Sequence, residues 1–249
     1  MTQEWTELEQ ILQSQTPGAD LQRAHARGDL ARWLPEVDAL WGVPQRADFH
    51  PEVDTGTHVC MVLDAARRLG ADTAGMWAAM THDVGKALTP AEDLPRHPMH
   101  EKRGIPVMEK IHARLQPPED CVKLATLVEK EHGNMHACQA AGVKGLLKLL
   151  ERCNALDDPQ TFDKALLAAE ADARGRGGDF PQSDYPQRAY LQQAASRLRE
   201  VRDALQANLH EGAEGRSAQS LEQSLHKMLV NTAEQSVKSL PRAPEDAPS

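Results

Sequence analysis

The stretch Thr81-His-Asp-Val-Gly-Lys-Ala87 follows an apolar helical segment and places an imidazole beside a carboxylate, at His82 and Asp83. Both side-chain types are common ligands of divalent metals, and a carboxylate can bridge two ions where an imidazole cannot. His58 lies 24 residues upstream, and seven of the eleven histidines fall between positions 58 and 136. This density predicts a metal centre of the hydrolytic kind, with Asp83 as the natural bridging ligand.

Further candidate ligands come from segments on both sides of this pair. His58 shares one side of a predicted helix with Met61, Val62 and Ala65, so its ring points inward and needs a hydrogen-bond partner or a metal. His100 and His132 are candidates for a second metal position, because two-metal sites stabilise both the attacking and the leaving oxygen in phosphoryl displacement. Such a ligand set leaves the ion open among Mn, Co, Ni, Fe, Mg and Zn.

Composition favours helices over sheets. Apolar residues make up 40% of the 249, but aromatic residues only 4%, so Ala, Leu and Val must fill the core. We therefore expect an all-α protein, since these residues suit close-packed helices. Helical spacing of apolar residues covers these segments: 20–34, 55–69, 73–86, 103–115, 119–133, 142–156, 160–173 and 186–209.

The chain is predicted to have three parts. Residues 1–18 form a short N-terminal helix whose apolar face starts at Trp5, residues 19–209 form one helical domain, and residues 210–249 form a helix followed by a partly disordered tail. The apolar stripe of 221–240 can pair with a second copy or fold back on the body, which leaves a homodimer possible.

Charge and cysteine content restrict the partners and the compartment. The formal net charge of −9 disfavours an extended nonspecific grip on nucleic acid, although a local basic pocket remains open. The four cysteines form no C-x-x-C pair and the N-terminus does not resemble a signal peptide, which favours a cytoplasmic protein with buried thiols. Apolar runs are far shorter than the ~20 residues that span a bilayer, so no membrane segment is expected.

Basic residues close to the predicted metal centre are candidates for binding substrate phosphate. Lys86 follows Asp83 by three residues and is also assigned a catalytic role, and Arg96 lies in the proline-rich loop of residues 87–98. Arg174 and Arg176 lie in a glycine-rich loop that ends at position 178. Guanidinium groups bind phosphate oxygens in pairs, so the arginines suit a phosphate ester.

Several stretches resemble the HD-domain metal-dependent phosphohydrolases, in particular the C-terminal HD domain of bacterial multifunctional CCA-adding enzymes (tRNA nucleotidyltransferases). The likeness covers roughly residues 20–205 and is carried by Leu34–Pro44, His50-Pro-Glu-Val-Asp-Thr-Gly-Thr-His58, His82–Pro90, Pro95–Glu101 and Glu170-Ala-Asp-Ala-Arg-Gly-Arg176. The resemblance implies an all-α HD-domain bundle with phosphatase and 2′,3′-cyclic nucleotide phosphodiesterase activity on nucleotide or RNA-derived phosphate esters, with tRNA as a possible partner. It implies that His58, His82 and Asp83 hold one metal and that Asn154 occupies a downstream ligand position. The nucleotidyltransferase head that precedes the HD part in those enzymes is not expected here.

Two positions leave a second function open. The family usually has Asp where this chain has Gly133 and Asn154, and an amide holds a divalent ion less strongly than a carboxylate. The alternative is a degenerate HD domain that recognises a nucleotide, a tRNA or a protein as a regulatory module. A further alternative is a tRNA-binding body that works with a separate nucleotidyltransferase head.

Overall fold

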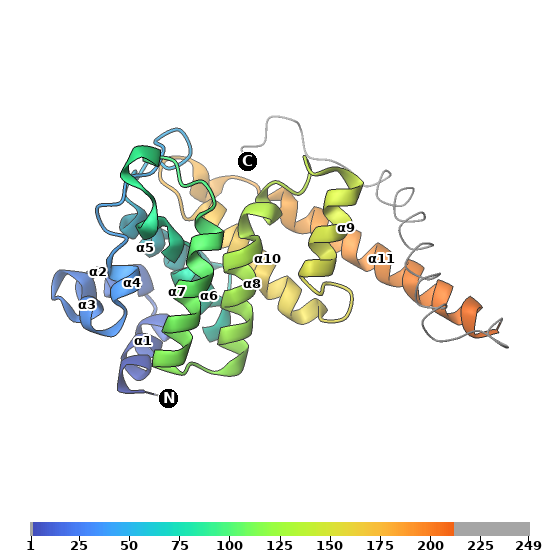
Figure 1. The fold of residues 1–249 in the computed structure, drawn as a ribbon, viewed down its shortest axis with the longest axis horizontal. Coiled ribbons are helices and arrows are strands. Elements are labelled where there is room, and N and C mark those ends of the chain that lie inside the picture. Colours follow the sequence, from blue (N-terminus) through green and yellow to red (C-terminus); the bar gives the residue numbers. More distant parts are fainter. Residues whose placement is uncertain (1, 212–249) are drawn as a thin grey trace. The chain divides into compact units, whose positions relative to one another are not determined.

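Residues 2–211 are described by the computed structural model, and their regular structure is helical (Figure 1). The all-α prediction is confirmed. An isolated antiparallel bridge between Pro44 and Asp54 is the β-type pairing recorded within this range. Among the same residues, no helix is both long and apolar enough to cross a membrane.

The chain divides into two compact units, one that runs to Gly133 and includes Lys164–Tyr185, and one that comprises Asn134–Asp163 and the chain from Pro186. The elements of the first unit are α1 (Gln3–Gln13), α2 (Pro17–Ala26), α3 (Asp29–Trp33), α4 (Pro35–Asp38), α5 (Thr55–Arg68), α6 (Thr73–Thr81), η1 (Val84–Leu88), η2 (Ala91–Asp93), α7 (His100–Leu115) and η3 (Phe180–Gln182). The second unit contains α9 (Gly142–Arg152) and α11 (Pro186–Glu211), whereas α8 (Glu119–His136) and α10 (Pro159–Arg174) run through both.

The N-terminal helix α1 packs against α2 and α6 within the first unit. Its face of Trp5, Leu8, Ile11 and Leu12 is buried, and the ring of Trp5 meets that of Trp77 edge-on at a centroid distance of 5.1 Å. Edge-to-face aromatic pairs add to the free energy gained from apolar burial. The face predicted for this helix is therefore the one that holds it on the core.

Helix α6 is buried on every side, because all residues from Ala74 to Thr81 are buried. Asp72 caps its first turn by accepting a hydrogen bond from the Gly75 N–H, as is usual for an aspartate at a helix N-terminus. A helix that is apolar all round belongs at the centre of its unit. The His82-Asp83 pair at its C-terminal end is thereby placed in the interior.

Three predicted helices end earlier than their apolar spacing indicates, and one of them is 142–156, which ends at Arg152. The segment 73–86 leaves the α-helix at Thr81, because Asp83 has φ −118° and ψ 13° and a 3-10 turn follows. The segment 20–34 forms two helices, since Gly28 takes a left-handed backbone with φ 75°. Glycine adopts this conformation without the steric cost that other residues meet.

Some expectations fall on residues that the structure does not describe. The predicted helix and tail of 210–249 lie almost wholly outside the described residues, as does the apolar stripe of 221–240. The possible homodimer therefore stays a prediction. The limits at 18/19 and 209/210 lie within the described residues and also stay predictions, although α2 begins at Pro17, before the first of them. The buried thiols are confirmed at Cys60, Cys121 and Cys138, and burial raises the pKa of each to about 12.

Gly85 permits the close approach of η1 to α7, and this contact yields a prediction about stability. A Cβ at position 85 would lie 2.0 Å from the His100 carbonyl oxygen and 2.6 Å from the Gly104 amide nitrogen. Because both atoms belong to the backbone, Gly85→Ala should lower the free energy of unfolding by about 1–3 kcal/mol or more, measured by urea denaturation.

The matched control is Gly133→Ala. There the Cβ would approach the end of the Glu101 side chain, which can move, and alanine favours a helix by up to about 1 kcal/mol over glycine. Equal losses of stability for the two substitutions would show that backbone contact at Gly85 is not the constraint.

Candidate metal centre

Five segments of the chain bring imidazole and carboxylate side chains to a common cluster in the first unit. The contributing residues are His58 on α5, His82 and Asp83 after α6, His100 at the start of α7, His132 on α8 and Asp172 on α10. Their ligand atoms form two groups, His58 with His82 and Asp172, and Asp83 with His100 and His132. Within each group these atoms lie within 4.8 Å of one another. The structure therefore brings together five of the six residues predicted to bind metal.

Each histidine of the cluster directs its Nδ1 at a backbone carbonyl oxygen. The pairs are His82 with Ala79 O at 2.9 Å, His132 with Val128 O at 2.9 Å, His100 with His97 O at 3.0 Å and His58 with Gly175 O at 3.1 Å. Because a carbonyl oxygen can only accept, the proton must lie on Nδ1. A neutral ring then presents the lone pair of Nε2 to the cluster, which is the arrangement of metal-binding histidines.

Asp83 lies between the two groups and turns one oxygen toward each. Oδ2 is 3.0 Å from His82 Nε2 and 3.8 Å from His58 Nε2, whereas Oδ1 is 3.3 Å from His100 Nε2. The residue is 1% exposed, and neither oxygen receives a well-aligned hydrogen bond from the described residues. A buried carboxylate requires a partner for its charge. Two divalent ions bridged by Asp83 would meet this need, so the residues present fit the predicted metals.

Asp172 is the carboxylate that the sequence prediction missed. Its Oδ1 lies 3.0 Å from His58 Nε2 and 3.7 Å from His82 Nε2. The sequence does contain a sign of this role. Asp172 follows the buried residues Ala168 and Ala169 at helical spacing, so it lies on the same buried face of α10. A carboxylate on an apolar helix face must find a charge partner. Asp172 thus completes the group that contains His58 and His82.

The ionisation of the cluster follows from its two carboxylates. Burial alone would lower the pKa of His82, but Asp83 and Asp172 outweigh it and raise this pKa well above the usual value. Burial alone would raise the pKa of Asp83, but His82 and Lys86 hold it well below its usual range. Burial, with His82 and His100, lowers the pKa of His132 to about 3. The carboxylates therefore favour positive charge here, while His132 stays neutral.

A further acidic residue, Glu52, contacts the outer side of His58. Its Oε1 lies 3.0 Å from His58 Nδ1 and 3.0 Å from His50 Nδ1, and the three residues form a third group of potential ligands. Burial alone would raise the pKa of Glu52, but hydrogen bonds from His50 and His58 outweigh it and lower this pKa strongly. Burial lowers the pKa of His50 to about 4, so this ring is neutral at pH 7.

The predicted phosphate-binding residues differ in their surroundings. Lys86 is buried, with Nζ 2.7 Å from Asp83 Oδ2 and 2.6 Å from Gln45 Oε1. Arg176 is also buried, with Nη2 3.8 Å from Asp172 Oδ1 and an Nε that has no hydrogen-bond partner in the described part of the chain. Both cations therefore adjoin the cluster.

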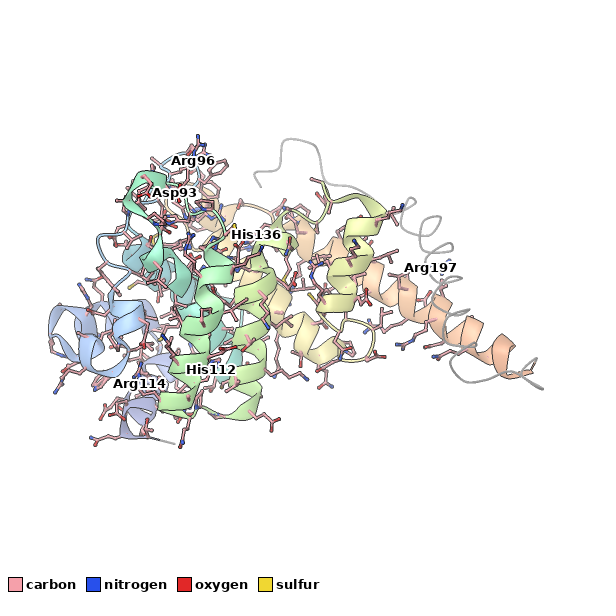
Figure 2. The ribbon with its side chains drawn as sticks, in the orientation of Figure 1. Asp93, Arg96, His112, Arg114, His136 and Arg197 are labelled. Carbon is pink, nitrogen blue, oxygen red and sulfur yellow. The ribbon has the colours of Figure 1, made fainter. Side chains whose placement is uncertain are left out.

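Arg174 and Arg96 lie in other settings. Arg174 pairs with Glu170 through Nη2 and Oε1 at 2.9 Å. Figure 2 shows Arg96 beside Asp93, at the end of the first unit opposite to Arg114 on α7, and the residue is exposed. A phosphate-binding role for these two arginines stays a prediction.

Asn154 belongs to the second unit, where it follows α9 with a left-handed backbone at φ 50°. Its carbonyl oxygen accepts hydrogen bonds from the amides of Asp157 and Asp158. Asparagine tolerates this conformation better than most residues, so the turn itself accounts for an asparagine at this position. Metal binding by Asn154 remains a prediction.

Glu129 yields a prediction about pH dependence. Its side chain is buried against Gly104, and neither oxygen has a hydrogen-bond partner within residues 2–211. Burial, reinforced by Asp83, raises its pKa from 4.5 to about 9. The folded state thus holds a proton that the unfolded state releases above pH 4.5. This contribution to stability is complete below pH 4.5 and is lost as the pH rises toward 9, by about 1.4 kcal/mol per pH unit at most.

Glu129→Gln should therefore flatten the pH dependence of unfolding between pH 5 and 9, measured by urea denaturation with a chelator present. The control is Glu119→Gln at the exposed start of α8. Parallel curves for wild type and Glu129→Gln would show that Glu129 does not hold this proton.

Comparison with known proteins agrees with this geometry. Residues 55–176 match the HD domain family, a range that contains every residue of the two ligand groups. The chain is 50% identical over 200 residues to a multifunctional CCA protein of Cupriavidus metallidurans, covering 80% of this chain and 46% of that protein. It is 45% identical over 233 residues to a multifunctional CCA protein of Burkholderia pseudomallei, covering 94% and 55%.

The chain spans about half the length of the curated relatives it matches. The matched half includes the whole cluster around Asp83. The match to the HD domain family therefore contains all the residues of the two ligand groups. The chain therefore contains an HD domain, similar in sequence to the corresponding part of multifunctional CCA proteins.

Proposed function

We propose that this protein is a metal-dependent phosphohydrolase, a phosphatase and 2′,3′-cyclic nucleotide phosphodiesterase that acts on nucleotide or RNA-derived phosphate esters. The HD match supports hydrolysis with a divalent metal. The substrate class rests on the relatives, which are named multifunctional CCA proteins, and tRNA is a possible source of such esters. The metal is one of Mn, Co, Ni, Fe, Mg or Zn.

The observation that carries the proposal is the position of Asp83 between two sets of Nε2 atoms. His58, His82 and Asp172 would hold one ion and His100 and His132 the other, with one oxygen of Asp83 on each side. When bound, such ions polarise a phosphoryl oxygen and make water more acidic. Imidazole and carboxylate ligands together suit this chemistry.

The residues of the chain have separate roles around the substrate. Lys86 Nζ donates toward Gln45 and Asp83 and has a third proton available for a phosphoryl oxygen. The Arg176 guanidinium lies over the Phe180 ring, 5.7 Å from its centroid, and it adjoins Asp172, where its charge would attract a phosphate ester. Helix α6 is buried along Ala74–Thr81 and leads directly into His82 and Asp83, so it keeps water away from this side of the cluster.

The alternative function is a degenerate HD domain that binds a nucleotide, a tRNA or a protein. The contact of Lys86 with Asp83 favours it, since an ammonium can neutralise this carboxylate without a metal. However, Lys86 compensates one charge, and Asp172 supplies a second carboxylate to the same cluster. His100 and His132 both direct Nδ1 at a carbonyl oxygen, and their Nε2 atoms lie 3.3 Å apart, so a metal would give these two facing lone pairs a common partner. The hydrolase is therefore the better supported function.

The direct test is hydrolysis of 2′,3′-cyclic AMP and of a generic phosphomonoester, with Mn, Co, Ni, Mg and Zn added singly. We expect activity that requires one of these metals and that falls at least about a hundredfold in Asp83→Ala, because the bridging charge is lost. Asp203→Ala, at an exposed position of α11, serves as the matched control. A folded protein that hydrolyses neither substrate with any metal would support the binding module instead.

A second test compares Asp172 with Asn154 as the downstream ligand. Asp172→Asn should weaken Mn²⁺ binding by more than about tenfold, because it removes a charged ligand atom, whereas Asn154→Ala should leave binding within about twofold. Titration calorimetry measures both. A large loss of affinity in Asn154→Ala would instead assign the downstream ligand to that residue.

A further inference from the structure

His58 is shared between two groups of potential ligands, and its two nitrogens cannot serve both. Nδ1 faces Glu52 and the Gly175 carbonyl oxygen, whereas Nε2 faces Asp172. A neutral imidazole has one protonated and one unprotonated nitrogen. Since the Gly175 carbonyl oxygen can only accept, Nδ1 carries the proton and Nε2 is left for the metal. The group of His50, Glu52 and His58 is therefore not a third metal site.

The Glu52 carboxylate is approached by N–H groups from three directions. Oε1 lies 3.0 Å from the Nδ1 atoms of both His50 and His58, and Oε2 accepts the Gly177 N–H at 2.9 Å. Its side chain is 3% exposed and that of His58 is fully buried. His50 and Gly177 donate to it, and the Nδ1–H of His58 is shared between Glu52 Oε1 and the Gly175 carbonyl oxygen. Only an acceptor such as a carboxylate therefore satisfies this position completely.

The loop that carries Glu52 is fixed on both sides. The Val53 amide donates to the His50 carbonyl oxygen at 2.8 Å and its own carbonyl oxygen accepts the Gln45 amide. Val53 itself has φ 60°, a conformation that a β-branched residue adopts only at a cost. Such strained residues persist where the surrounding structure holds them, and here the turn keeps Glu52 in contact with His58.

We infer that Glu52 is a positioning residue for the metal centre, one that orients His58 and fixes its Nδ1 proton so that Nε2 binds metal. Carboxylates that accept the second N–H of a metal-binding histidine act in this way and increase the basicity of the ring. The Gly177 N–H donates to the same carboxylate and lies in the loop that carries Arg176. The Glu52 side chain thus contacts both His58 and the loop that positions Arg176. The inference rests on the proposed metal centre, but not on which ester is hydrolysed.

The test is the affinity for Mn²⁺, measured by titration calorimetry on the full chain without substrate. Glu52→Gln should weaken binding by about 10–100-fold, because the amide lacks the charge and its NH2 group faces one of the three donors. Glu52→Ala should weaken it at least as much. Glu36→Gln is the matched control, because Glu36 pairs with Arg114 on the exposed side of α7 and should leave the affinity within about twofold.

Two further readouts separate positioning from a general structural role. Circular dichroism of each metal-free variant should match that of the wild type, and the visible absorption spectrum of the Co²⁺-loaded protein should change in Glu52→Gln but not in Glu36→Gln. A variant with a lower melting temperature but unchanged Mn²⁺ affinity and Co²⁺ spectrum would overturn the inference. Wild-type protein that binds Mn²⁺ but hydrolyses no ester would refute the proposed function alone, since the Glu52 comparison does not use a substrate.

Discussion

The charge of the Asp83 carboxylate is the constraint on which the rest of the first unit depends. The group is 1% exposed at the end of a helix that is buried on every side, and a buried charge is costly unless it is compensated. Compensation comes from His82 and Lys86, which hold the pKa of Asp83 down, and from the position of His100 beside Oδ1. The helices α5, α7, α8 and α10 each present a polar side chain toward this point while their other faces form the apolar core. The same helices thus form both the apolar core and the candidate site.

The histidines differ in how far along the chain their orienting partners lie. His82, His100 and His132 each donate to a carbonyl oxygen three or four residues earlier, so the local backbone fixes these rings. His58 depends instead on Gly175 and Glu52, which come from other segments. Gly175 reaches this position because it has no side chain, since a Cβ there would lie 2.5 Å from Val62 Cα. The orientation of His58 is therefore the one that requires the tertiary fold to be complete.

This difference explains what the sequence could predict. The His82-Asp83 pair, the inward face of His58 and the all-α class follow from local spacing and composition, and the structure bears out the class and the clustering. Asp172 lies in a stretch that resembles the family, but its contact with His58 spans 114 positions, and no local pattern encodes such a contact. The sequence also could not predict the early end of α6, because the apolar spacing continues through Val84. The turn depends on the close approach of Gly85 to the backbone of α7.

Gly133 and Asn154 stand where the family usually has aspartate. They argue less strongly against a metal centre when the other carboxylates near these positions are considered. Gly133 lies next to His132 on α8, and a Cβ there would meet the Glu101 side chain, which bears one negative charge close by. Asn154 has a left-handed backbone that asparagine tolerates, so its identity has a conformational reason. Asp172 meanwhile places a carboxylate 3.0 Å from His58 Nε2. The negative charge that a divalent ion needs is therefore present in the first unit, supplied by α10, even though two positions where the family usually has aspartate lack it.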